Sequence, residues 1–111
     1  MEVTFERAKE SKICNSASRL KGEYGPRMAS LIQERLASLA AVDTLAGMRS
    51  LPGRCHELTG DLKGRLALDL VHPQRLVFQP ADDPIPVLPS GGLDWDKVTK
   101  VEIWRIGDYH G

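Results

Sequence analysis

Apolar residues follow a helical spacing in the first half of the chain and a strand spacing in the second half. Between residues 26 and 41 they recur every three or four positions, which predicts an amphipathic helix with one face packed on a sheet. Gly25 ahead of this helix and Pro26 at its first position mark its start. The apolar positions are Met28, Leu31, Ile32, Leu36 and Leu39.

Shorter elements are predicted on either side of this helix. Asn15 and Ser16 are suitable N-cap residues for a helix that ends near Tyr24. Pro52–Gly53 is a turn signal that closes the helical half. The other elements expected here are a strand at residues 3–5 and helices at about 6–14 and 44–48.

From the Pro52–Gly53 turn onward the period changes to two. Leu66, Leu68 and Leu70 alternate with other residues, which is typical of a half-buried strand. The connection His72–Gln74 is short enough for an antiparallel hairpin with the strand that follows it. The expected strands cover residues 54–58, 65–71, 74–79 and 98–106.

These patterns predict an α+β fold in which N-terminal helices pack on one face of a mostly antiparallel sheet of four to five strands. We expect a single domain over residues 1–111, with a helical part at about 1–50 and a sheet part at about 53–110. A stiff loop is predicted ahead of the last strand. This loop holds four of the seven prolines: Pro80, Pro84, Pro86 and Pro89.

The composition gives no sign of a charged partner, a membrane span or a metal site. Fifteen Lys and Arg balance fifteen Asp and Glu, so the net charge of zero indicates no particular binding partner. No apolar run approaches the ~18 residues of a membrane span, and the first residues lack the shape of a signal peptide. Cys14 and Cys55 match no metal spacing and are expected to be buried and reduced. We therefore expect a cytoplasmic protein with no metal, no cofactor and no membrane contact.

The segment Gly107-Asp108-Tyr109-His110 is the strongest candidate for chemistry, because it directly follows an apolar run, residues 101–106, that is predicted to be a strand. Chain ends are usually frayed, so polar groups placed here suggest that they are held for use. A histidine beside a carboxylate is suited to acid–base work. His56 and Arg75 are two further candidates, although either one alone has an ordinary surface explanation.

Three segments of the chain occur in an order typical of one protein family. They are His56-Glu57-Leu58-Thr59-Gly60-Asp61-Leu62-Lys63-Gly64, Gln74-Arg75-Leu76-Val77-Phe78 and Gly107-Asp108-Tyr109-His110. Over nearly its whole length the chain resembles the HigB-like (killer protein) branch of the RelE/ParE toxin superfamily. That branch typically reads His-Pro-Leu-Lys-Gly-Asp, then Trp-Arg-Ile-Thr-Phe, and ends in Glu-Asp-Tyr-His.

The resemblance implies the toxin of a type II toxin–antitoxin system, an endoribonuclease that cuts mRNA in the ribosomal decoding site. It implies a helix-turn-helix antitoxin as partner, with operator DNA bound only through that antitoxin. By position, Arg75 matches the family's phosphate-binding arginine, and Arg54, Lys63 and Arg65 are candidate substrate-binding residues. The residues that match the acid–base set are His56, Asp108, Tyr109 and His110.

Cleaving RNA without a metal requires a base for the ribose 2′-OH, an acid for the leaving 5′ oxygen and a cation for the phosphate charge. Histidine or a carboxylate supplies the first two, and a guanidinium the third through paired hydrogen bonds.

The chain departs from the family at Thr59, where a lysine is common, with Lys63 and Arg65 nearby as possible replacements. Its proline-rich loop is also longer, and its net charge is low for a protein that binds ribosomal RNA. Two alternatives therefore stay open: a ParE-like toxin that binds DNA gyrase, and a non-catalytic binding partner of an antitoxin that acts in operon autoregulation.

Overall fold

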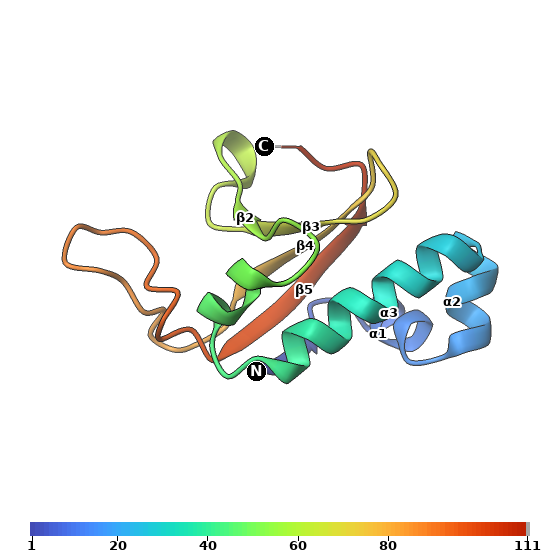
Figure 1. Cartoon of the computed structure of the whole chain (residues 1–111), viewed down its shortest axis with the longest axis horizontal. Coiled ribbons are helices and arrows are strands. Elements are labelled where there is room, and N and C mark those ends of the chain that lie inside the picture. Colours follow the sequence, from blue (N-terminus) through green and yellow to red (C-terminus); the bar gives the residue numbers. More distant parts are fainter. Residues whose placement is uncertain (111) are drawn as a thin grey trace.

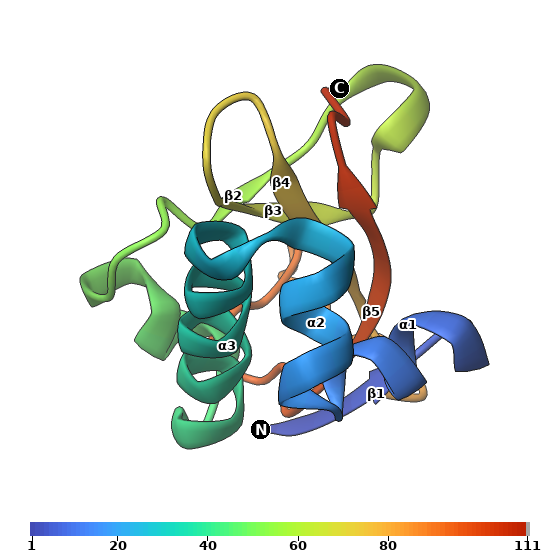
Figure 2. The same ribbon diagram turned by 90° about the vertical axis from the view of Figure 1, so that its right-hand side faces the viewer.

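Helix α3 (Pro26–Ala41) forms with the predicted bounds and lies across one face of the sheet. A computed structural model describes residues 1–110, and Figures 1 and 2 show α2 and α3 on one side of the strands. Ala29, Ile32 and Leu39 of α3 are buried against the sheet, and the other predicted stripe residues are half-buried beside them. The remaining helices are α1 (Ala8–Cys14), α2 (Ala17–Tyr24) and the short 3-10 helices η1 (Leu45–Ser50) and η2 (Gly60–Leu62).

The sheet has five strands in the order β1-β5-β4-β3-β2. All neighbouring strands are antiparallel except the pair β1 and β5, which is parallel, so the predicted α+β fold with a mostly antiparallel sheet is confirmed. The strands are β1 (Glu2–Phe5), β2 (His56–Glu57), β3 (Leu66–Asp69), β4 (Arg75–Pro80) and β5 (Lys100–Gly107).

A β-bulge interrupts the pairing of β4 with β5. The register runs from Val77 opposite Arg105 to Phe78 opposite Ile103, so Trp104 is an extra residue on β5. The extra residue breaks the alternation of faces, and Ile103 and Ile106 both pack toward the helices although they are three positions apart. Trp104 instead packs on the opposite face of the sheet.

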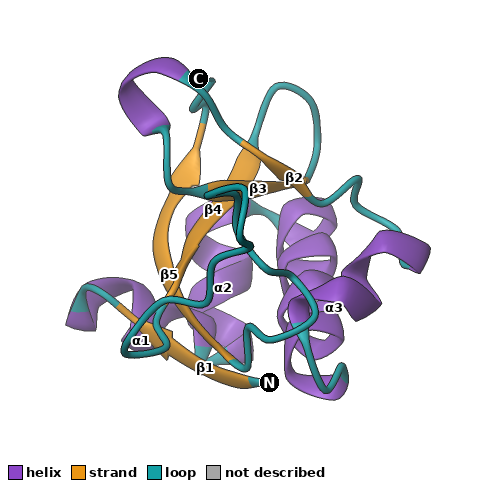
Figure 3. Ribbon diagram, turned by 90° about the vertical axis from the view of Figure 1, so that its left-hand side faces the viewer, coloured by secondary structure: helices purple, strands orange, loops and turns teal. Residues whose placement is uncertain are grey.

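The proline-rich connection between β4 and β5 forms a protruding arm, residues 81–99, at the end of the molecule opposite α1 and α2 (Figure 1). Figure 3 looks onto this arm, which is drawn as a teal loop. Its base is held by the Asp82 carboxylate, which accepts hydrogen bonds from Thr99 and from the backbone of Lys100. Trp95 is buried and donates its indole N–H to Glu57 at 3.1 Å.

The two cysteines are free, half-buried thiols. Burial raises the pKa of Cys14 to about 11 and that of Cys55 to about 12, so both thiols stay protonated at neutral pH. In the described part of the chain, no helix is both long and apolar enough to cross a bilayer.

Replacing Gly53 with alanine is expected to lower the free energy of unfolding by about 2–4 kcal/mol. Gly53 has a φ of 112°, and an added Cβ would lie 2.7 Å from the Nε atom of Arg35. That Nε donates to the backbone oxygen of Asp69, so the clash also weakens the support of β3.

Urea unfolding followed by circular dichroism measures this loss of stability. Gly64→Ala is the matched control, because Gly64 also has a positive φ, 95°, but nothing lies within 4 Å of its added Cβ. Equal losses in the two variants would mean that the contact with Arg35 has no energetic weight.

Candidate functional site

The sequence-predicted site residues gather on the face of the sheet that points away from α3, which we call the distal face. On β3, Leu66 and Leu68 pack in the main core beneath α3, so Ala67 and Asp69 point to the distal face. The pairing of the strands then places His56 of β2 beside Ala67, and Arg75 of β4 beside Asp69. The distal face therefore carries both His56 and Arg75.

His56 and Arg75 are close but do not touch. His56 is opposite Ala67 and Arg75 is opposite Asp69, so the two residues lie two strands apart and two residues apart along the strands. Strand spacings of ~4.8 Å and a rise of ~3.4 Å per residue place their Cα atoms roughly 12 Å apart. Both side chains therefore border the same part of the distal face.

The orientation of the His56 ring is set by a local hydrogen bond. Its Nδ1 lies 2.7 Å from the backbone oxygen of Arg54. Because a carbonyl only accepts, Nδ1 carries the proton in this contact, and the neutral ring keeps Nε2 as its proton acceptor. The half-buried His56 thus has the tautomer that a general base needs.

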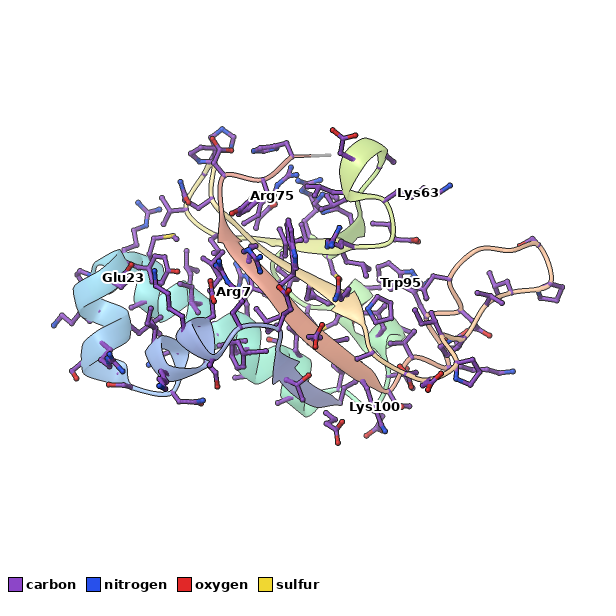
Figure 4. All side chains as sticks on the ribbon, turned by 180° about the vertical axis from the view of Figure 1, so that it is seen from behind. Arg7, Glu23, Lys63, Arg75, Trp95 and Lys100 are labelled. Carbon is purple, nitrogen blue, oxygen red and sulfur yellow. The ribbon has the colours of Figure 1, made fainter. Side chains whose placement is uncertain are left out.

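Arg75 links β4 to the segment that follows β5. Its Nη1 donates to the backbone oxygen of Tyr109 at 3.5 Å, and its Nε lies 3.7 Å from the Asp69 carboxylate. Figure 4 shows Arg75 beneath the turn of the chain that carries this segment. The side chain is only 15% exposed, so Arg75 is largely enclosed by these contacts.

Asp69 is the central anion of this edge. It accepts two hydrogen bonds from Arg54, at 2.8 and 3.2 Å, in addition to its contact with Arg75. Burial acts to raise the pKa of Asp69, but the hydrogen bond from Arg54 and the charges of Arg54, Arg75 and His56 outweigh it and hold the pKa below its usual value. One carboxylate therefore partly neutralises two arginines.

The segment Asp108–His110 folds back onto the distal face. The Tyr109 ring contacts Trp104 edge to face, with ring centroids 5.3 Å apart. It also lies against Gly107, where an added Cβ would approach the ring to 2.9 Å. The His110 Nε2 lies 2.8 Å from the Asp108 carboxylate, and both side chains are about half exposed. These contacts hold the segment in place while leaving its acid–base groups open to solvent.

The three candidate substrate-binding residues differ in their surroundings. Arg54 is engaged by Asp69, and Lys63 is exposed and extends outward beyond η2, away from Arg75 (Figure 4). Arg65 lies over the ring of Trp104, with its Cζ 4.1 Å from the ring centroid. Arg105 contacts the same ring at 4.8 Å and is paired with Glu6. Only Arg65 and Arg54 thus lie close to the other candidate residues.

Two residues of this site, Asp69 and Trp104, were not singled out from the sequence. Asp69 had one signal in the sequence, because it lies in the predicted strand 65–71 whose hairpin partner carries Arg75; the register that pairs the two residues comes from the structure. Trp104 had none, because its place on the distal face depends on the bulge.

Comparisons with known proteins find similar folds among solved structures only. No model of a protein family matches the sequence, and no curated protein matches it either. Among solved structures, a YoeB/ParE toxin from Agrobacterium tumefaciens has a TM-score of 0.61 at 11% identity, covering 99% of this chain and 100% of that one. A YoeB–YefM complex from Staphylococcus aureus has a TM-score of 0.58 at 18% identity, and a YoeB dimer from the same organism 0.56 at 20%. Each of these two covers 100% of this chain and 98% of its own.

These likenesses establish the fold. The chain has the α+β fold of YoeB/ParE toxins, as the RelE/ParE resemblance predicted. At 11–20% identity they do not extend to activity or to partners. They also leave the HigB-like branch as a prediction.

Proposed function

We propose that this protein is the cytoplasmic toxin of a type II toxin–antitoxin pair, and that it is a ribosome-dependent mRNA endoribonuclease of the HigB-like branch. Its partners are a helix-turn-helix antitoxin, the ribosome and mRNA, with operator DNA bound only through the antitoxin. The proposal is carried by the shared placement of His56, Arg75 and the Asp108–His110 segment on the distal face.

The proposed reaction uses these groups without a metal. The His56 Nε2 accepts the proton of the ribose 2′-OH, and the 2′ oxygen attacks the adjacent phosphorus. Arg75 stabilises the charge that develops on the phosphate oxygens. His110, held by Asp108, donates a proton to the leaving 5′ oxygen. The P–O5′ bond breaks, leaving a 2′,3′-cyclic phosphate and a 5′-hydroxyl end.

The test is induced expression without the antitoxin, followed by mapping of mRNA 5′ ends. We expect growth arrest together with new 5′-hydroxyl ends inside translated reading frames, and no such ends when initiation is blocked. Growth arrest without new ends contradicts the nuclease proposal.

One observation favours the second candidate function, a non-catalytic partner of an antitoxin. The Asp69 carboxylate pairs with both Arg54 and Arg75. Little free positive charge is therefore left for RNA at the part of the distal face where β3 and β4 meet their turn. Under this alternative the protein binds its antitoxin but leaves both growth and mRNA unchanged.

The arm (residues 81–99) supports an antitoxin partner under either candidate function. The exposed large apolar side chains of the described residues all lie on it: Ile85, Val87 and Leu88. Ile85 and Val87 border a groove of about 690 Å³ that also reaches Leu58 and Lys63. The arm carries four Asp and one Lys, a charge that repels RNA and suits a protein segment with apolar residues flanked by Lys or Arg.

Substituting both Ile85 and Val87 with serine is expected to weaken antitoxin binding at least tenfold and leave the stability unchanged. These side chains are 50% and 63% exposed, so they contribute little to the core. The measurements are titration calorimetry with the purified antitoxin and urea unfolding. A variant with parental affinity excludes the arm from the interface.

A further inference from the structure

Arg65 occupies a position on the distal face that the proposed reaction does not use. It lies immediately before β3, and its backbone oxygen accepts a hydrogen bond from Leu58 at 2.8 Å. Its guanidinium lies over Trp104, with 4.1 Å between Cζ and the ring centroid. Trp104 is in turn packed against Tyr109. The side chain is therefore supported by an aromatic surface that is itself fixed.

Arg65 differs from the other arginines of this face in lacking a compensating anion. Arg54 and Arg75 share the Asp69 carboxylate, and Arg105 is paired with Glu6. Among residues 1–110, no carboxylate forms an ion pair with Arg65, and its buried Nε has no hydrogen-bond partner. A buried donor left unsatisfied is unfavourable, so Arg65 is held here at a cost in stability, with no ion-pair partner for its guanidinium charge among the described residues.

The support by Trp104 explains how this cation is kept in place. A guanidinium that stacks on an indole gains cation–π attraction and loses side-chain freedom before any ligand arrives. The in-plane N–H groups of a stacked guanidinium stay available for the two-pronged contact that a phosphate accepts. Lys63, by contrast, is exposed and has no such support.

The position of Arg65 separates it from the phosphate assigned to Arg75. Arg75 is the pairing partner of Asp69, which lies four residues along the chain from Arg65. At ~3.4 Å per residue this is roughly 13–14 Å along the sheet, more than one phosphate group spans. The two guanidinium groups are linked by a chain of contacts: Arg65 lies over Trp104, Trp104 packs against Tyr109, and Arg75 donates to the Tyr109 backbone oxygen.

We propose that Arg65, held on Trp104, binds a second phosphate of the RNA strand, separate from the one that is cleaved. This inference rests on the proposed function for its ligand, single-stranded RNA, and adds a second anchoring point on the distal face. Trp104 acts as a positioning residue.

The test uses a ligand that is not cleaved. The probe is a fluorescein-labelled, 2′-O-methyl single-stranded RNA of about ten nucleotides, and its binding is followed by fluorescence anisotropy between about 50 and 200 mM salt. Arg65→Met removes the charge but keeps an unbranched apolar side chain on Trp104. We expect about tenfold weaker binding and a salt slope smaller by about 0.7, the loss of one phosphate contact.

Two further variants separate the phosphate contact from other effects. Arg65→Lys keeps the charge and is expected to keep the salt slope. Arg19→Met removes the same charge from the exposed surface of α2 and is expected to change the affinity less than twofold. Equal effects of Arg65→Met and Arg19→Met would overturn the inference. So would the same loss of slope in Arg65→Lys as in Arg65→Met, or a parent protein that does not bind the probe.

The outcome is independent of catalysis. If the parent binds the probe through Arg65 but leaves mRNA uncut in cells, the nuclease proposal fails and the RNA contact of Arg65 stands. If mRNA is cut and the Arg65 variants bind like the parent, the nuclease proposal stands and the inference fails.

Discussion

A protein that lacks residues 108–111 is expected to fold and to have lost its growth-arresting activity. The deletion removes Asp108 and His110, whose proposed role is proton donation to the leaving group. The main core is untouched, because the last residue of β5 that packs in it is Ile106. Loss of the half-buried Tyr109 from Trp104 is expected to cost about 1–2 kcal/mol of stability.

Growth after induction, mRNA 5′-end mapping and circular dichroism measure the two parts of this prediction. The double variant Asp108→Asn/His110→Gln is the matched control, because it keeps Tyr109 in place and removes only the charged groups. We expect it to be as inactive as the deletion. A deleted protein that is folded and still stops growth as the parent does would show that toxicity arises elsewhere, and would favour the gyrase-binding alternative.

The parts of the fold that were predictable are those set by local patterns. Helix α3 follows from a single apolar stripe with Gly25 and Pro26 at its start. The hairpin of β3 and β4 follows from the alternation Leu66, Leu68, Leu70 and the short turn after it. In both cases the residues that decide the structure are close to one another in the sequence.

The parts that were not predictable depend on contacts between distant segments. The parallel pairing of β1 with β5 joins residues about a hundred positions apart, and nothing in Glu2–Phe5 indicates its partner. The bulge at Trp104 is likewise fixed by how β4 and β5 pair. Strand β2 is two residues long where five were expected, because the chain turns into η2 after Leu58.

The same distinction holds for the site. The resemblance identified His56, Arg75 and the Asp108–His110 segment, and the structure places them on one face. Their proposed roles stay a prediction. Asp69 pairs with both Arg54 and Arg75 only because the strands bring these residues together. Arg65 contacts Trp104 only because the bulge turns the Trp104 side chain to the distal face. These two contacts decide how much free positive charge the distal face carries.

Replacing His56 with asparagine is expected to slow mRNA cleavage by at least about a hundredfold, with little effect on RNA binding. The asparagine amide N–H₂ occupies nearly the position of Nδ1, so it keeps the hydrogen bond to the Arg54 backbone oxygen. It has no counterpart of Nε2, so the proton acceptor is lost while the local structure is retained. A group that acts only in the transition state lowers kcat and leaves KM unchanged.

Single-turnover cleavage of mRNA on purified, programmed ribosomes measures this loss directly. His72→Asn is the matched control, because His72 is exposed in the β3–β4 turn and has no role in the proposed reaction. We expect it to cleave at the parental rate. If His56→Asn also cleaves at that rate, His56 is not the base. If His56→Asn instead raises KM at constant kcat, His56 binds RNA and takes no part in moving the proton.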